Sequence, residues 1–148
     1  FYGAAVLNGA AQARVTGLVD HRAPQTSSSQ NIRSVLADES KMNFTGTVYV
    51  ARTAQKTDAH QLSRAILLSP RAQMRVEPQL EIYADDVACA HGATCGALDE
   101  EVLFYLASRG LPADEARGLI LQGFLSDVLS HVPEQTRAHV LTTLQEGK

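Results

Sequence analysis

Tryptophan is absent from this 148-residue sequence, and aromatic residues make up only 5% of it. A groove that binds sugars by stacking them on aromatic rings is therefore poorly supplied. Basic residues are not in excess, because the formal net charge is −3, and this balance argues against a nucleic-acid-binding surface. Long apolar runs are also missing. No segment approaches the ~20 residues of a membrane-spanning helix, and the opening residues do not have the pattern of a signal peptide.

Cysteine is scarce as well. Cys89 and Cys95 are too few for a disulfide framework. We therefore expect a reduced, cytoplasmic setting. The first residue is Phe1 rather than Met, and residues 1–7 have the composition of the middle of a strand. We expect the sequence to be part of a longer chain.

Residues 1–98 have the pattern of short strands separated by turn residues. In the clearest segment, 72–84, polar side chains at odd positions alternate with apolar ones at Ala72, Met74, Val76, Leu80, Ile82 and Ala84. This period of two predicts a strand with one buried face. Pro78 interrupts the apolar series, and we expect a bend there.

The alternation changes parity after Asp85 and Asp86. A new series then follows at odd positions: Val87, Cys89, His91, Ala93, Cys95 and Ala97. This shift predicts a corner followed by another strand. No amphipathic helix separates the strands, which argues against a doubly wound sheet. A sandwich, a barrel and a β-solenoid all stay compatible, because no strict short repeat marks a regular solenoid. Residues 23–31 are predicted to be an exposed loop.

The last third of the chain has a helical pattern. Asp99 is a suitable N-cap for a first helix, which Gly110 ends. Pro112 suits the first position of a second helix. The predicted inner face of that helix is Ala116, Leu119, Ile120, Gly123, Phe124, Asp127 and Val128. Pro133 stops the second helix and opens a third over 134–145.

The chain therefore divides into a β domain, residues 1–98, and a helical domain, residues 99–148. The last strands of a β-structure leave backbone groups and apolar side chains exposed, and helices often cover them. Covering the last strands is one interpretation of the helical domain. Binding a partner is the other, and the periodicity alone does not separate the two.

Residues 79–94 (Gln-Leu-Glu-Ile-Tyr-Ala-Asp-Asp-Val-Ala-Cys-Ala-His-Gly-Ala-Thr) resemble the signature stretch of the SufB/SufD family of iron–sulfur cluster assembly scaffolds. The same resemblance extends to residues 98–101, 104–106, 108–110, 20–24 and 54–59. SufB members usually carry a Glu-His-Glu-Ala type run where this chain has Cys-Ala-His-Gly-Ala at 89–93. The difference favours the SufD branch of the family.

The resemblance implies a mainly β fold, in which the C-terminal coils of a parallel β-helix precede a small α-helical domain. It implies a scaffold subunit of the SUF complex rather than an enzyme. In that complex the β-helix pairs with a SufB-like paralogue, and a SufC-like ATPase is expected to bind the helical domain. No stably bound cofactor is expected, only a transient iron–sulfur cluster. The chain alone is expected to form a homodimer through residues 1–7 or the later coils.

Cys89 and His91 are the candidate site residues. Two positions apart in a strand, their side chains point to one face, and thiolate sulfur and imidazole nitrogen both bind iron. The resemblance implicates the histidine at position 91 in cluster assembly at the interface with the paralogue, with the cysteine at 89 nearby. Two ligands are too few for a stable tetrahedral site, so we expect further ligands from a partner. A buried structural Cys or His is the alternative interpretation. Cys95 matches no family cysteine and is given no role.

Other chemistry has weaker support in the sequence. Adjacent acids at a turn, such as Asp85 and Asp86, are usually solvated. Asp20, His21 and a serine of 27–29 are the residue types of a hydrolase triad. The sequence has no nucleophile-elbow motif to support one. No Gly-rich phosphate loop is present, so ATP is expected to bind a partner. The alternative function is a β-helix enzyme acting on carbohydrate or acyl substrates, which would need a groove lined by several acids or a basic triad.

Overall fold

The computed structural model of the chain describes residues 1–146, which form seven strands followed by three helices. The strands are β1 (Tyr2–Leu7), β2 (Gln12–His21), β3 (Ser27–Leu36), β4 (Lys41–Val50), β5 (Asp58–Leu67), β6 (Gln73–Ile82) and β7 (Ala88–Ala97). The helices are α1 (Glu100–Ser108), α2 (Ala113–Leu129) and α3 (Glu134–Glu146).

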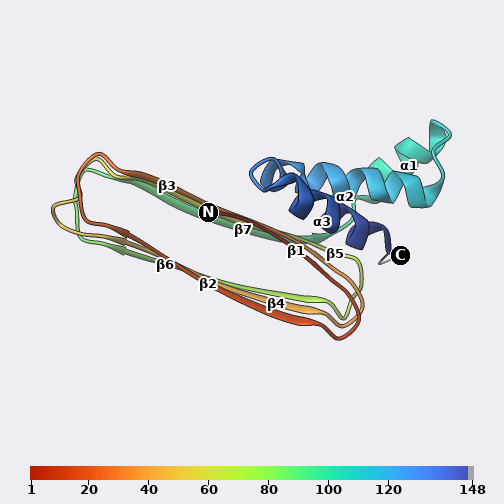
Figure 1. Cartoon of the computed structure of the whole chain (residues 1–148), viewed down its shortest axis with the longest axis horizontal. Helices are drawn as coiled ribbons and strands as arrows, with labels where there is room; N and C mark the ends of the chain where they lie inside the picture. The colour runs from red at the N-terminus through yellow and green to blue at the C-terminus, as the bar shows by residue number, and fades with distance from the viewer. Residues whose placement is uncertain (147–148) are drawn as a thin grey trace.

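The strands form two sheets. Sheet A has the order β1-β3-β5-β7, and sheet B has the order β2-β4-β6. Each strand from β1 to β5 pairs in parallel with the strand two further along the chain, so the chain passes alternately from one sheet to the other. Figure 1 shows the two layers joined by corners at both ends. This architecture is a parallel β-helix, which the strand pattern left undecided and the family resemblance predicted. That prediction is confirmed.

The register stacks equivalent residues of successive coils on one another. Thr26 and Thr57 lie 31 residues apart, as do Gln30 and Gln61, and the side chains of each pair are in contact. Inward-pointing side chains therefore form columns that run along the β-helix. A register shift of one residue would turn a whole column outward, so burial of one face specifies the pairing strongly.

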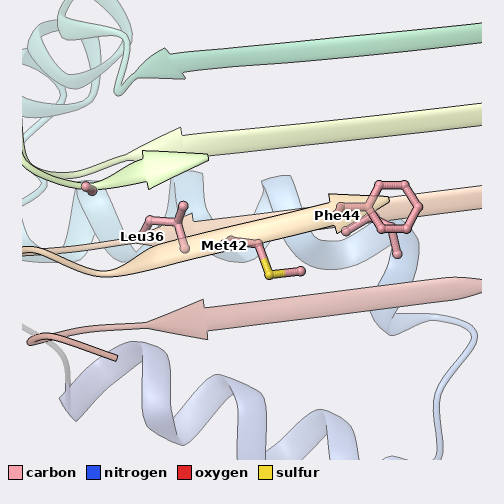
Figure 2. Close-up of a cluster of buried hydrophobic side chains, with 5 residues drawn as sticks. Leu36, Met42 and Phe44 are labelled. Atoms are coloured by element: carbon pink, nitrogen blue, oxygen red, sulfur yellow. The ribbon is translucent and has the colours of Figure 1, made fainter. Parts of the chain in front are cut away.

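The apolar core lies between the two sheets. Leu36 of β3 and Met42 and Phe44 of β4 are exposed by 2% or less, and Figure 2 shows the three side chains between the strands. Side chains along β4 alternate between buried and half-buried, because this strand lies in the middle of sheet B. Aromatic and β-branched residues such as Phe44 and Val48 suit such a position.

The bend expected at Pro78 is absent, because β6 is continuous through it. Gln73 donates its backbone N–H to Ser40, just before β4, and Tyr83 donates to Val50 at the end of β4, both at 2.9 Å. Since successive residues of a strand direct their backbone groups to opposite sides, the nitrogen of Pro78 faces the free edge of sheet B. The missing N–H of proline therefore breaks no bond within the sheet.

The loop expected over residues 23–31 is shorter than predicted. β3 begins at Ser27 and pairs with β5, and both Gln30 and Asn31 are buried. Their polar side chains are typical of a loop but have partners here. Gln30 is hydrogen-bonded inside the β-helix, and Asn31 donates to Asp127 of α2.

The predicted limits of the first helix are confirmed. The Asp99 side chain accepts hydrogen bonds from the backbone N–H groups of Glu101 and Val102 at 2.9 and 3.3 Å. Gly110 follows α1 with a φ of 90°, which glycine adopts without steric cost. Pro112, predicted at the first position of the second helix, lies instead at the N-cap position, one residue before α2 begins.

The face that α2 buries overlaps only in part with the predicted one, since Ala116 and Val128 are buried as predicted. Leu121, Leu125 and Leu129 are buried, whereas Leu119, placed on the predicted inner face, is 53% exposed. Apolar residues occur around most of the circumference of α2, so the i, i+3, i+4 spacing fits more than one face. Contact with sheet A, which the periodicity does not describe, selects the face that is buried.

The helices lie on the flank of the β-helix and not over its last coil. α2 and α3 contact β1 and β3, and α1 lies beyond the ends of the strands (Figure 1). The apolar cluster shared by strands and helices has as its buried members Val35, Leu121, Leu125, Leu129 and Leu144. The interpretation that the helices cover the last strands is therefore wrong, because they cover the apolar outer face of sheet A.

The change from strands to helices occurs between Ala97 and Glu100. Whether residues 1–98 and 99–148 fold as separate domains stays a prediction, and residues 147 and 148 lie outside the described part of the chain. Within the described part, none of the helices is long and apolar enough to cross a membrane.

Arg33 of β3 attaches α2 to sheet A. Its Nη2 lies 2.6 Å from Asp127 Oδ2, and its Nη1 donates to the Phe124 carbonyl. Its guanidinium carbon also lies 5.4 Å from the centre of the Phe124 ring. Asn31 Nδ2 donates to the same carboxylate oxygen at 2.9 Å. Asp127, the one polar residue of the predicted stripe, thus joins the helix to two residues of β3.

We expect Asp127→Ala to lower the free energy of unfolding by about 1–2 kcal/mol, because the largely buried Arg33 loses its charged partner while Asp127 itself is partly solvated. Asp127→Asn keeps an acceptor oxygen and should lose less. Urea denaturation of the two variants beside the wild type measures the difference. Equal stability of all three proteins would contradict the attachment role.

Candidate functional site at the last strand

β7 is the last strand of sheet A, and none of the described residues pairs with its outer edge. Ala88 donates its backbone N–H at 2.9 Å to the carbonyl of Thr57, the residue just before β5. The odd-numbered residues from Cys89 to Ala97 therefore direct their backbone groups to the free edge. β6 is the free edge of sheet B, where Pro78 removes one donor. β6 and β7 are the two free edges of the last coil. Of these, only β7 has a backbone N–H on every residue.

Three side chains with metal-binding chemistry point from β7 toward the interior of the β-helix: Cys89, His91 and Cys95. Their register partners are buried residues of β5: Ala59, Gln61 and Ala65. Cys89 is half-buried against the apolar cluster that includes Val48 and Val50, whereas His91 and Cys95 are exposed. The prediction that the three side chains share one side of the strand is confirmed.

Their spacing along β7 places Cys89 and His91 close together and Cys95 far from both. Residues of a strand are about 3.3 Å apart along its axis, so the Cα atoms of Cys89 and His91 are about 7 Å apart and their side chains can converge on one iron site. Cys95 is about 13 Å beyond His91, too far to bind the same iron atom. The described residues hold no cluster of three or more His, Cys, Asp or Glu side chains suited to a metal ion.

The Cys89 thiol is favoured in its protonated form. Burial is the main cause of its raised pKa, and the charge of Asp58 adds to the rise, while a backbone hydrogen bond with Ala59 opposes it. Cys95 is exposed overall, but partial burial still raises the pKa of its thiol. Since the thiolate is the form that binds metal, an iron ion must displace a proton from Cys89.

We expect alkylation of Cys89 by iodoacetamide to be slower at about pH 7.5 than that of an unperturbed thiol, whose pKa is about 8.5. A raised pKa reduces the thiolate fraction at every pH below it, so the rate should keep increasing beyond the ordinary thiol range. Mass spectrometry of the Cys95→Ser variant, labelled across a pH series, measures this rate. A profile identical to that of a short cysteine peptide would contradict the effect of burial.

Gln61 is the residue at this site that the sequence patterns missed. It is 3% exposed and lies beside His91 in the neighbouring coil. A polar residue does not contribute to an apolar alternation and so gives no periodic signal of burial. The recurrence of glutamine 31 residues after Gln30, in the interval that also separates Thr26 from Thr57, is the signal that could have found it.

Comparison with known families decides the assignment. The family model described as SUF system FeS cluster assembly, SufBD core domain, matches residues 1–124. The chain belongs to the SufBD core family. The resemblance seen in residues 79–94 is thereby confirmed over most of the chain.

Several proteins are similar to this SufBD core chain. Protein ABCI7, chloroplastic, of Arabidopsis thaliana is 40% identical over 129 residues, which are 83% of this chain and 27% of that protein. The iron–sulfur cluster assembly protein SufD of Escherichia coli is 37% identical over 110 residues, covering 74% of this chain and 26% of the relative. SufD of Bacillus subtilis is 36% identical over 114 residues, covering 77% and 26%. The chain spans about a quarter of the length of these relatives.

The SufBD core fold does not assemble the hydrolase triad considered from the sequence. His21 is buried, with Nδ1 2.7 Å from Thr26 Oγ1 and Nε2 2.9 Å from Ser28 Oγ. Asp20 instead pairs with Arg22 at 2.6 Å. His21 thus joins the hydroxyl groups at the corner between β2 and β3, and no carboxylate of residues 1–146 bonds to its ring to orient it.

The other acidic candidates of the SufBD core chain do not form a catalytic group either. Asp85 and Asp86 are exposed at the corner before β7, where the Asp86 backbone N–H donates to Gln55. A hollow of about 560 Å³ on the outer face of sheet B is lined in part by Asp20 and Glu81. Because Arg22 neutralises Asp20 there, this hollow does not provide the several acids that a carbohydrate or acyl enzyme needs.

Proposed function

We propose that this chain is the cluster-facing part of a scaffold subunit in a SUF complex, where it pairs with a SufB-like paralogue and binds a SufC-like ATPase. His91 and Cys89 hold a nascent iron–sulfur cluster transiently, as cargo rather than as a resident cofactor, and the subunit itself catalyses no reaction. The observation that carries the proposal is the position of both side chains on the last strand, beside an open backbone edge. A cytoplasmic setting stays a prediction.

The edge of β7 supports pairing with a paralogue. Its ten residues contain no proline and no Lys, Arg, Asp or Glu, the side chains that usually protect a strand edge from pairing. A second β-helix that aligns a strand with this edge gains a row of backbone hydrogen bonds. The same docking places residues of the paralogue opposite His91 and Cys89, where they can supply the remaining ligands to iron.

Exposed apolar side chains on the helices support the binding of an ATPase. Phe104 is 77% exposed, and Tyr105 and Leu119 are exposed by more than half. Leu119 also lines a groove of about 400 Å³ together with Leu111 and two acids, Asp114 and Glu115. Large exposed aromatic residues, and apolar grooves with a charged rim, are both typical of protein–protein contact surfaces.

The test is capture of the intact protein by its candidate SufB-like and SufC-like partners, with and without ATP. Ala93→Pro removes a backbone donor from the free edge of β7, and its ring blocks an incoming strand. We expect this variant to bind the SufB-like partner at least about tenfold more weakly. Ala93→Ser keeps the donor and is the matched control. Equal capture of both variants would contradict pairing through β7, and capture of a second copy in place of the paralogue would favour the homodimer.

The same capture assay separates the ATPase surface from the β7 edge. Phe104→Ser, Glu115→Lys and Arg117→Glu should weaken binding of the SufC-like ATPase and leave binding of the SufB-like partner unchanged. Glu134→Lys, an exposed change on α3, is the control. Unchanged ATPase binding across the three α1 and α2 variants would show that the surface lies elsewhere.

A further inference from the structure

Three polar side chains form one column inside the β-helix: Gln30 of β3, Gln61 of β5 and His91 of β7. The register pairs Gln30 with Gln61 and Gln61 with His91. Gln30 and Gln61 are 1% and 3% exposed, and Gln61 Nε2 donates to Gln30 Oε1 at 3.2 Å. The column begins in the core and ends at the open coil, where His91 is exposed.

The opposite sheet leaves space for this column. Gly46 of β4 faces Gln61, and a Cβ atom at Gly46 would lie 1.7 Å from Gln61 Nε2 and 2.9 Å from Gln61 Cδ. Gly17, which pairs with Gly46, faces Gln30 in the preceding coil. Any larger residue at position 46 would push the Gln61 amide out of its place. The fold therefore provides specific space for the Gln61 side chain in the core.

One end of the Gln61 amide has no partner. With the amide as assigned in the structure, its Nε2 donates to Gln30 Oε1 and its Oε1 is buried without a hydrogen bond among the described residues, as is Nε2 of Gln30. A buried carbonyl oxygen without a donor is rare, because burial removes its bonds to water. The residue beside it in the following coil is His91, whose imidazole ring carries an N–H in its neutral form.

We propose that Gln61 is a positioning residue for His91, with its Oε1 accepting the N–H of one imidazole nitrogen once a partner covers the open coil. The bond selects one neutral tautomer and leaves the lone pair of the other ring nitrogen directed at the interface. Metal-binding histidines commonly use a carbonyl or carboxylate in this way, and the bond raises the basicity of the ligand nitrogen. The inference rests on the proposed function, in which His91 binds the nascent cluster.

The test uses the intact protein co-expressed with its SufB-like and SufC-like partners. Gln61→Leu removes the acceptor but keeps an apolar side chain of similar size, so folding and partner capture should be preserved. Iron and sulfide content of the purified complex should fall at least about tenfold, as is usual when such a supporting residue is lost. Gln61→Glu restores an acceptor of the same length and should recover most of the loading.

A structure of the assembled complex without cluster provides a second readout that does not depend on loading. A His91 ring nitrogen should lie about 2.7–3.2 Å from Gln61 Oε1. A longer distance in the assembled complex, or full loading of Gln61→Leu when His91→Ala is empty, would overturn this inference alone. Full loading of His91→Ala would overturn both the proposed function and the role of Gln61.

Discussion

His91→Ala should reduce the iron and sulfide content of the complex at least about tenfold, while its folding and partner capture stay close to those of the wild type. The His91 side chain is exposed at the open coil, so truncating it removes little packing. If His91 instead filled the core, the same change would leave a cavity or an unpaired buried group and cost about 1–3 kcal/mol. Thermal denaturation, read beside metal analysis of the complex, distinguishes the two cases.

The two cysteines provide the matched comparison for that experiment. Cys89→Ser should also lower loading, because it replaces a soft thiolate beside His91 with a poor ligand for iron. Cys95→Ser should have no effect, because Cys95 is about 13 Å from His91 along the strand. A loss of loading in Cys95→Ser equal to that in Cys89→Ser would refute the assignment of the pair.

Phe44→Ala is expected to have the largest effect on stability, a loss of about 3–5 kcal/mol. Phe44 is 0% exposed in the middle strand of sheet B, and the strands on both sides prevent the space from closing. Chemical denaturation measures the loss. Leu18→Ala is the control, because Leu18 on the outer face of the same sheet is 67% exposed and should change stability by less than about 0.5 kcal/mol. Similar losses in both variants would show that the core does not lie between the sheets.

Much of the fold could be predicted wherever a local pattern carried the information. The alternation over residues 72–84, the corner at Asp85 and Asp86 and the caps of α1 all depend on neighbouring residues, and the structure has each of them. The pairing of strands about 30 residues apart could not be predicted this way, because no local pattern records which strand lies beside which. The family resemblance supplied that step.

The errors in prediction share a physical cause, which is contact with a distant element. Pro78 continues a strand because its nitrogen faces a free edge, and Gln30 and Asn31 belong to a strand because the interior and α2 supply their partners. At the candidate site, the parity of Cys89 and His91 could be predicted from alternation alone. Gln61 could not, since only the stacking of coils brings it beside His91.

The uneven size of the coils has a consequence for how such a chain can change over generations. Stacked residues are 29 positions apart at Gly9 and Asp38, 31 at Gln30 and Gln61, and 32 at Thr47 and Gln79. Strands β2 to β7 all have ten residues, so the corners absorb the differences. Single-residue insertions and deletions should therefore survive at corners and be lost from strands. Duplication of a whole coil would preserve every column, which gives a gene of this kind a simple way to lengthen.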